Sequence, residues 1–350
     1  MKALFKGQNY WILFTGAILS IVCLFFANLF LGTVHISLSQ ILDLLTNGDS
    51  SRSSDYIIIA EMRFPKAVTA AFGGASLAVS GLLMQTLFRN VLADPYILGA
   101  SSGASLGVCL SILMGGMAGS GGFMGVSIFH ELNTILAAAV GAGGVMGMML
   151  IISAYVRQMG IVLIAGVMIG SFISAVVGVI IYYASPESVQ FFTIWAMGSF
   201  REVSNAQLFI LVPLLSGGLV FSFIIIKQLN TFYLRDIQAI SLGVPLKKVR
   251  ILVIVNAALL AGTVTSYCGP IAFLGIAVPH LARGLFRDMN HRVLVPATCL
   301  LGAAFGLSCS LLAELPGTSH TLPVNAASAL LGAPIVTWVL LRRRSMGKIL

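Results

Sequence analysis

The stretch RFPKAVTAAFGGASLAVSGLLMQTLFRNVLADPYILGASSGASLG, residues 63–107, decides the fold. Its residues 67–88 carry no charged side chain, and a helix of that length crosses a hydrocarbon core of roughly 30 Å. The polar turn 89–96 follows, and a second apolar run begins with Gly99-x-x-x-Gly103. Glycines at this spacing let helix backbones approach closely. The stretch therefore predicts one membrane crossing, a tight turn and the start of a second crossing.

The composition extends this prediction to the whole chain. Of its 350 residues, 58% are hydrophobic and 9% are charged, whereas soluble domains carry about 25% charged residues. The net charge of +9 is spread over loops between apolar runs, which indicates membrane topology rather than nucleic-acid binding. The first apolar run, 10–32, is too long for a signal-peptide core and predicts a retained span. The five cysteines lie in or beside apolar runs without a C-x-x-C pair, which favours small packing residues over metal ligands or disulfides.

Apolar runs predict an all-α polytopic membrane protein with about ten transmembrane helices, in one transmembrane domain covering residues 1–350. The ten predicted spans are Tyr10–Gly32, Ala67–Phe88, Tyr96–Met117, Leu132–Val156, Ile161–Tyr183, Ala206–Ile226, Ile251–Cys268, Ile271–Leu285, Val293–Ala313 and Leu322–Leu341. The eighth is short and contains Pro279, so we expect it to be tilted, broken or buried in protein rather than facing lipid.

The lysines and arginines predict the orientation. With a cytoplasmic N-terminus and alternating spans, the outside positions are Arg52, Arg63, Lys66 and Arg201, and the other 16 of the 20 basic residues are inside. An excess of lysine and arginine is typical of the cytoplasmic loops of a membrane protein. We therefore expect both termini in the cytoplasm.

Three segments between the spans have distinct patterns. The outer loop 33–62 contains an amphipathic stretch that predicts a short surface helix. The segment 191–200 is apolar but too short to span, so we expect a re-entrant or interfacial piece with Trp195 at the membrane boundary. The polar segment 227–250 is the largest inner loop.

The spans carry almost no ionisable groups. Proton-coupled transporters and intramembrane enzymes need such groups, so the sequence predicts no catalytic residues, no metal site and no cofactor bound by this chain. It contains no G-x-x-x-x-G-K-[ST] phosphate loop. If the chain takes part in active transport, the energy must come from another subunit.

Several motifs resemble the FecCD permeases, the membrane subunits of bacterial ABC importers for ferric siderophores, haem and cobalamin. The first is R-x-P-K with S-G-x-x-x-Q, R-N-x-L-A-x-P and G-x-x-x-G-A in residues 63–104, and the second is G-P-I-A-F-L-G-I-A-V-P-H-L-A-R at 269–283, followed by N-H-R. The resemblance covers nearly the whole chain. It implies a type II ABC importer permease in the bacterial inner membrane. In such an importer two permease copies pair with two ATP-binding cassette subunits, which hold ATP and Mg²⁺, and with a periplasmic binding protein.

The resemblance also implies where the ATPase binds. In the family, an A-x-x-L-G segment of the inner loop docks on the ATPase, and it matches Ala239, Ser241, Leu242 and Gly243 here. Gly243 and Pro245 would end the short helix. In the second motif, Pro279 frees a backbone carbonyl, and His280 and Arg283 are predicted to have a structural or coupling role at the cytoplasmic edge.

On the outer side, the resemblance implies that Arg63 and Lys66 receive acidic groups of the binding protein. Anchoring of the span by snorkelling is the alternative. A third basic docking position of the family falls on Glu314. The family's E-L-P-x-G that follows is T-L-P-V-N at 321–325, so this part of the docking surface departs from the family pattern.

The resemblance further implies inner gates and a pathway along the fifth span. The gates map onto the turn after the second span and the turn before the fifth, and the lining candidates follow. These residues are Asn90, Val91, Leu92, Met159, Gly160, Gly166, Gly170, Ser171, Ser174 and Gly178. Small residues at such spacing also serve plain helix packing, and both interpretations stay open at this point.

The favoured function is import of a bulky metal chelate by a homodimer, or a dimer with a paralogue, that uses a partner's ATPase. An ion-coupled secondary transporter and a non-transporting membrane scaffold are the alternatives. Lipid is an expected partner and nucleic acid is not.

Overall fold

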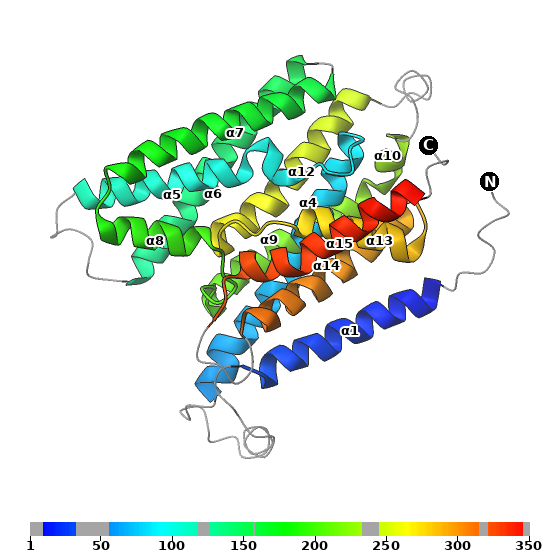
Figure 1. Cartoon of the computed structure of the whole chain (residues 1–350), viewed down its shortest axis with the longest axis horizontal. Helices are drawn as coiled ribbons and strands as arrows, with labels where there is room; N and C mark the ends of the chain where they lie inside the picture. Colours follow the sequence, from blue (N-terminus) through cyan, green and yellow to red (C-terminus); the bar gives the residue numbers. More distant parts are fainter. Residues whose placement is uncertain are drawn as a thin grey trace. The chain divides into compact units, whose positions relative to one another are not determined.

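The computed structural model describes residues 10–32, 56–117, 127–156, 158–232, 245–314 and 321–345, and all regular structure in these ranges is helical (Figure 1). The longer helices are α1 (Tyr10–Phe30), α4 (Phe64–Leu87), α5 (Ala100–Met117), α6 (Ser127–Tyr155), α7 (Met159–Tyr182), α9 (Asn205–Ile224), α12 (Leu246–Cys268), α14 (His291–Ala313) and α15 (Val324–Ser345). The shorter helices are α8 (Pro186–Ala196), α10 (Ile226–Thr231) and α13 (Leu274–Phe286), with a π-helical segment at Ile57–Arg63 and a 3-10 turn at Pro95–Leu98.

Each of the ten predicted spans overlaps one of these helices. In the described ranges, seven helices are long and apolar enough to cross a membrane, and three shorter apolar helices correspond to α5, α13 and α15. The all-helical polytopic fold is thereby confirmed. The eighth predicted span is α13, with 13 residues, and most of its side chains, including Pro279 and His280, are buried in the protein as expected.

The second span differs from its prediction at its N-terminal end. The outer loop was expected to continue to Met62, but the π-helical segment Ile57–Arg63 leads directly into α4. The helical stretch Ile57–Leu87 therefore has 31 residues. Its first residues are Ile57, Ile58 and Ile59, whose apolar side chains continue the helix beyond the charged Arg63 that marked the predicted boundary.

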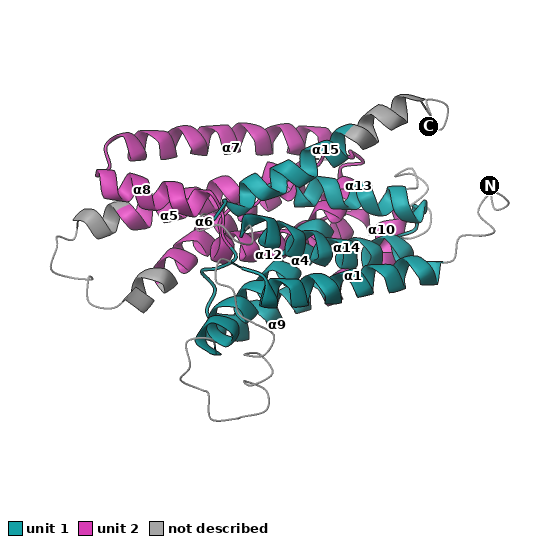
Figure 2. Cartoon of the chain, turned by 60° about the horizontal axis from the view of Figure 1, so that its bottom comes forward, with its two compact units in different colours: residues 1–79, 200–219, 272–350 teal, residues 80–199, 220–271 magenta. Residues whose placement is uncertain are grey.

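The chain divides into two compact units, shown in Figure 2. Unit 1 contains residues 1–79, 200–219 and 272–350, and unit 2 contains residues 80–199 and 220–271. Two of the boundaries fall inside α4 and α9, so these helices belong to both units.

Unit 1 is organised around a close contact between α4 and α14. A Cβ atom added at Gly74 would lie 2.3 Å from the carbonyl oxygen of Gly302, and one at Gly306 would lie 2.2 Å from that of Ala70. Such a separation excludes any side chain, so glycine is required at the crossing. Helix α14 also contacts α1, α13 and α15.

Unit 2 is organised around a similar contact between α5 and α6. A Cβ atom at Gly107 would lie 1.9 Å from the carbonyl oxygen of Ala137, and one at Gly141 would lie 2.1 Å from that of Gly103. Helix α12 packs against α6, and α7 packs against α5. The glycine spacing in the sequence therefore predicted a real helix crossing, although its partner α6 was not specified.

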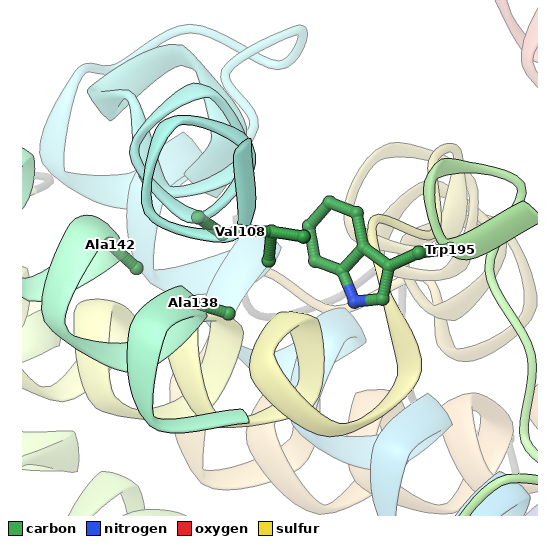
Figure 3. Close-up of a cluster of buried hydrophobic side chains, with 5 residues drawn as sticks. Val108, Ala138, Ala142 and Trp195 are labelled. Carbon is green, nitrogen blue, oxygen red and sulfur yellow. The ribbon is translucent and has the colours of Figure 1, made fainter. Parts of the chain in front are cut away.

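The position of the Trp195 side chain also differs from its prediction. It was expected at the membrane boundary, but it is 6% exposed and packs in a core cluster of unit 2 with Val108, Ala138 and Ala142 (Figure 3). The segment around it forms α8, which begins at Pro186 with a hydrogen bond from the Ser188 amide to the Ser185 hydroxyl. The small side chains of α5 and α6 leave room for the indole, which the local sequence of α8 cannot reveal.

Candidate functional site

A buried ion pair lies at the predicted outer end of unit 1. Lys66, in the first turn of α4, places its Nζ 2.5 Å from Oε2 of Glu314, which follows the last residue of α14. The other carboxylate oxygen, Oε1, lies 3.3 Å from Nε of Arg201, in the turn before α9. We call Lys66, Glu314 and Arg201 the outer charged cluster. Burying an unpaired charge costs several kcal/mol, so Glu314 provides the counter-charge that Lys66 needs.

Arg63 is also buried, but it has a different contact. Its Nη1 donates hydrogen bonds to the carbonyl oxygens of Leu29 and Phe30, at 2.9 and 3.1 Å. These carbonyls belong to the last turn of α1, whose orphan carbonyl groups need a donor. A cation there also interacts favourably with the helix dipole. In this structure Arg63 caps α1, whereas the sequence suggested docking or snorkelling.

The outer charged cluster explains the departure from the family pattern at Glu314. Glu314 stands where a basic residue was expected, and the structure surrounds it with Lys66 and Arg201. Arg201 was not singled out from the sequence, because a charge 113 positions before Glu314 gives no local signal. The negative charge of Glu314, at a position that is basic in the family, was the available signal for such a partner, since a buried carboxylate needs a cation beside it.

The second departure, Asn325, also has a structural partner. Its Oδ1 accepts a hydrogen bond from the amide of Ala272, at 3.1 Å. Asn325 lies in the first turn of α15, and Ala272 precedes α13. The side chain therefore ties the start of α15 to the segment before α13, a contact that glycine could not make.

The predicted inner gate after the second span is a compact turn. Arg89 has a positive φ of 50°, and its Nε donates a hydrogen bond to the carbonyl of Phe232 at 2.9 Å. Asn90 accepts a hydrogen bond from the amide of Leu92, and Leu92 is exposed while Val91 is half-buried. The turn is thus closed by Asn90, and Leu92 is the side chain that it presents outward.

Asp94 continues this turn into the buried part of unit 2. Its Oδ1 accepts a hydrogen bond from the amide of Tyr96 at 2.9 Å, which caps the 3-10 turn. Burial raises the pKa of the Asp94 carboxyl to about 6, although this hydrogen bond acts in the opposite direction. The hydroxyl of Tyr96 then accepts a hydrogen bond from the amide of Ile271 at 3.1 Å. These contacts fix the turn on the end of α12.

The structure separates the predicted pathway residues of α7 into two groups. Gly166 is buried, and a Cβ atom there would lie 2.3 Å from the carbonyl oxygen of Ile97, so it serves packing. Gly170 is half-buried near the Ser102 hydroxyl. The remaining candidates on this helix are half-buried or exposed within the chain; they are Met159, Gly160, Ser171, Ser174 and Gly178.

His280 and Arg283 lie on the short helix α13. Nδ1 of His280 donates to the carbonyl oxygen of Ile276, at 2.8 Å. Arg283 is half-buried in the last turn of α13, where a cation suits the helix dipole.

Two further predictions concern ATPase coupling and metal binding. The coupling segment Ala239, Ser241, Leu242 and Gly243 lies outside the described residues. In the ranges that the structure describes, three or more His, Cys, Asp or Glu side chains nowhere approach closely enough to hold a metal ion.

The apolar helices and the close glycine crossings are those of a polytopic membrane protein. The sequence comparison specifies the family: the FecCD transport family matches residues 18–342, and the chain belongs to it. It is the membrane-embedded, non-catalytic permease subunit of an ABC importer. The ion-coupled carrier and the scaffold are therefore set aside.

Relatives match over most of the chain. A "Probable iron chelatin transport system permease protein" of Helicobacter pylori is 32% identical over 97% of this chain and 99% of its own length. The vitamin B12 import permease BtuC of Klebsiella pneumoniae is 32% identical over 91% of this chain and 93% of its own, and the hemin permease HmuU of Yersinia pestis is 31% identical over 84% and 86%.

A solved structure agrees with the fold. A metal-chelate type ABC transporter in an inward-facing conformation superimposes with a TM-score of 0.80 and 27% sequence identity, over 94% of this chain and 99% of the other.

Proposed function

We propose that the chain carries a bulky metal chelate, such as a ferric siderophore, haem or cobalamin, into the cytoplasm. The observation behind this proposal is the shared chemistry of the cargoes that the relatives' names print: iron chelatin, hemin and vitamin B12. Each is a metal ion enclosed by an organic ligand. A permease for such cargo needs a wide passage rather than a set of metal-binding side chains.

Helix α7 supports a passage of this kind. Its sequence contains no charged residue, and its exposed positions include Gly160, Ser171 and Ser174 among larger apolar side chains. Small and hydroxyl side chains leave space and offer weak hydrogen bonds. A passage lined by them would release a large cargo readily, because translocation requires binding that is weak enough to leave.

In the proposed transporter, two permease copies enclose the passage, and two ATPase subunits bind the inner loops. ATP binding would close the segment around Leu242 and Gly243 against the ATPase and move the gates at Asn90–Leu92 and Met159–Gly160. The binding protein would deliver cargo from outside, and both termini would lie in the cytoplasm, in accordance with the distribution of lysine and arginine.

The coupling segment provides the sharpest test of this function. Proline at Gly243 would change the end of the predicted helix, because its ring fixes φ and removes an amide donor. We expect Gly243→Pro to abolish ATP-dependent uptake while the ATPase remains expressed. A suitable control is Gly217→Ala in α9, where an added Cβ atom meets open space.

Uptake of radiolabelled ferric siderophore, haem or cobalamin into vesicles that contain the complete transporter measures the effect. Loss in Gly243→Pro with retention in Gly217→Ala supports the proposal. Unchanged uptake by Gly243→Pro would remove the coupling role, and ATP-independent uptake driven by an ion gradient would contradict the mechanism.

A further inference from the structure

The turn between α13 and α14 exposes arginine and large apolar side chains within a few positions of one another. Arg287 and Arg292 are exposed, and the nearby Leu285 and Met289 are 42% and 52% exposed. At the surface of a bilayer, arginine reaches the phosphates of the lipid, while apolar side chains enter the boundary of the acyl chains. The composition of this turn therefore suits a membrane surface.

Several hydrogen bonds hold this turn in one conformation. Arg287 has a positive φ of 48°, and its amide donates to the carbonyl oxygen of Arg283 at 3.1 Å. Oδ1 of Asp288 accepts a hydrogen bond from the Asn290 amide at 2.9 Å. Oδ1 of Asn290 in turn accepts one from the Arg292 amide at 3.0 Å. The two exposed arginines are thus carried by a preformed turn, which lowers the entropy cost of binding a ligand.

The turn is joined to the start of α1. The hydroxyl of Tyr10 donates a hydrogen bond to Oδ2 of Asp288 at 3.1 Å, and the Tyr10 ring stacks on that of Phe286 with 6.4 Å between the centroids. Trp11 follows and is 84% exposed. Tyrosine and tryptophan gather at the level of the lipid headgroups, so these two aromatic side chains indicate that the turn lies at that level.

Helix α1 also favours lipid over another protein as the partner of this surface. Only 11% of its apolar window is buried, the smallest share among the seven helices of the described residues that could cross a membrane. It packs against α14 and forms an outer edge of unit 1 (Figures 1 and 2). A soluble ATPase approaches a bundle from the aqueous phase, whereas a peripheral span is surrounded by lipid. The arginines of the attached turn are therefore within reach of lipid headgroups.

We propose that the turn between α13 and α14, together with the start of α1, binds the headgroup of an anionic phospholipid in the cytoplasmic leaflet. Arg287 and Arg292 contact its phosphate, and Leu285 and Met289 contact the upper part of its acyl chains. Basic residues next to a span attract anionic lipid, and the bound lipid would hold the peripheral α1 against α13 and α14. This inference goes beyond the proposed function, because it concerns neither the cargo nor ATP.

Fluorescence quenching by brominated lipids tests the proposal beside the turn itself. The complete transporter is placed in phosphatidylcholine vesicles that contain brominated phosphatidylglycerol or brominated phosphatidylcholine. In each variant, the signal of Trp11 is the part of the fluorescence that Trp11→Phe removes. We expect phosphatidylglycerol to be preferred at Trp11 by at least about fivefold, because arginine near the membrane surface attracts anionic lipid. The double variant Arg287→Gln/Arg292→Gln should abolish this preference.

The matched control is Lys247→Gln/Lys248→Gln, which removes the same charge from two exposed positions in the first turn of α12 and should keep the preference. Unchanged quenching by brominated phosphatidylcholine in the arginine variant shows that α1 remains in place.

Equal quenching by both lipids in the unmodified transporter overturns the proposal, and so does a preference that survives in the arginine variant. An equal loss of preference in the lysine control would assign the effect to the overall surface charge. Loss of the ATPase from the purified transporter in the arginine variant, without any change in lipid preference, would assign the turn to the ATPase. Each of these last two results also overturns the proposal.

Discussion

Lys66 and Glu314 form a buried ion pair that joins the start of α4 to the end of α14 across 248 positions of sequence. Neither group could be buried alone, because the desolvation of one charge costs several kcal/mol without a partner. Both lie at the ends of apolar helices, so the pair closes the helix packing of unit 1 without placing a charge in the apolar interior.

This pair predicts a difference between single and double substitutions. Glu314→Leu should lower the free energy of unfolding by about 3–5 kcal/mol, because it leaves the buried charge of Lys66 uncompensated. Lys66→Met should cost less, because Arg201 still pairs with Glu314. The double variant Lys66→Met/Glu314→Leu should recover most of that loss, since apolar pairs often replace buried ion pairs at little cost. Thermal unfolding of the detergent-solubilised protein measures all three, and an additive double variant would contradict the coupling.

Arg63 should behave as a helix cap rather than as a docking residue. Arg63→Met keeps much of the apolar stem but removes the donors to the carbonyls of Leu29 and Phe30. We expect faster amide hydrogen exchange in the last two turns of α1, because that end is no longer held. Affinity for the binding protein should change little. A large loss of affinity with unchanged exchange would show that docking is the main role of Arg63.

The glycines of α6 provide a matched pair two positions apart. A Cβ atom at Gly141 would lie 2.1 Å from the carbonyl oxygen of Gly103, whereas one at Gly143 meets nothing within 4 Å. Gly141→Ala should destabilise the protein by about 1–3 kcal/mol, since the helices must separate. Gly143→Ala should stabilise it by up to about 1 kcal/mol, because alanine favours the helix. Equal effects in thermal unfolding would contradict the close crossing of α5 and α6.

The sequence predicts the helices more completely than their contacts. Long uncharged runs such as residues 67–88 are local signals, so all ten predicted spans overlap helices. Gly103 was correctly expected at a helix crossing, but Gly99 has a positive φ of 85° and ends the 3-10 turn instead. Glycine permits both a close helix crossing and a positive φ, and the sequence alone does not distinguish these two roles.

Only those residues of the candidate site that lie at family motif positions could be predicted from the sequence. Arg63, Lys66 and Glu314 could be selected from family positions, but their partners depend on distant segments. Arg201 contributes to the cluster from a turn without a motif of its own. Trp195 likewise lies in a core formed by α5 and α6, so its aromatic character suggested a membrane boundary that the tertiary packing overrides.

Asp94 gives the last prediction, a pH dependence of stability. In the folded protein its pKa is raised to about 6 by burial, whereas in the unfolded chain it is about 4. The protonated carboxyl is therefore favoured by folding: its contribution is fully present below about pH 4 and is lost as the pH rises through about 6. Asp94→Asn keeps an oxygen that can accept the hydrogen bond of the Tyr96 amide, but it cannot ionise.

The comparison of Asp94→Asn with the unmodified protein isolates this effect. Thermal unfolding in detergent between pH 4 and pH 7 should show the substituted protein gaining relative stability as the pH rises, by up to about 3 kcal/mol. Half-buried Asp288, whose Oδ1 accepts a hydrogen bond from the Asn290 amide in a similar turn, provides the control Asp288→Asn. If both variants follow the unmodified protein in parallel over this range, Asp94 is not buried as a carboxyl that titrates near pH 6.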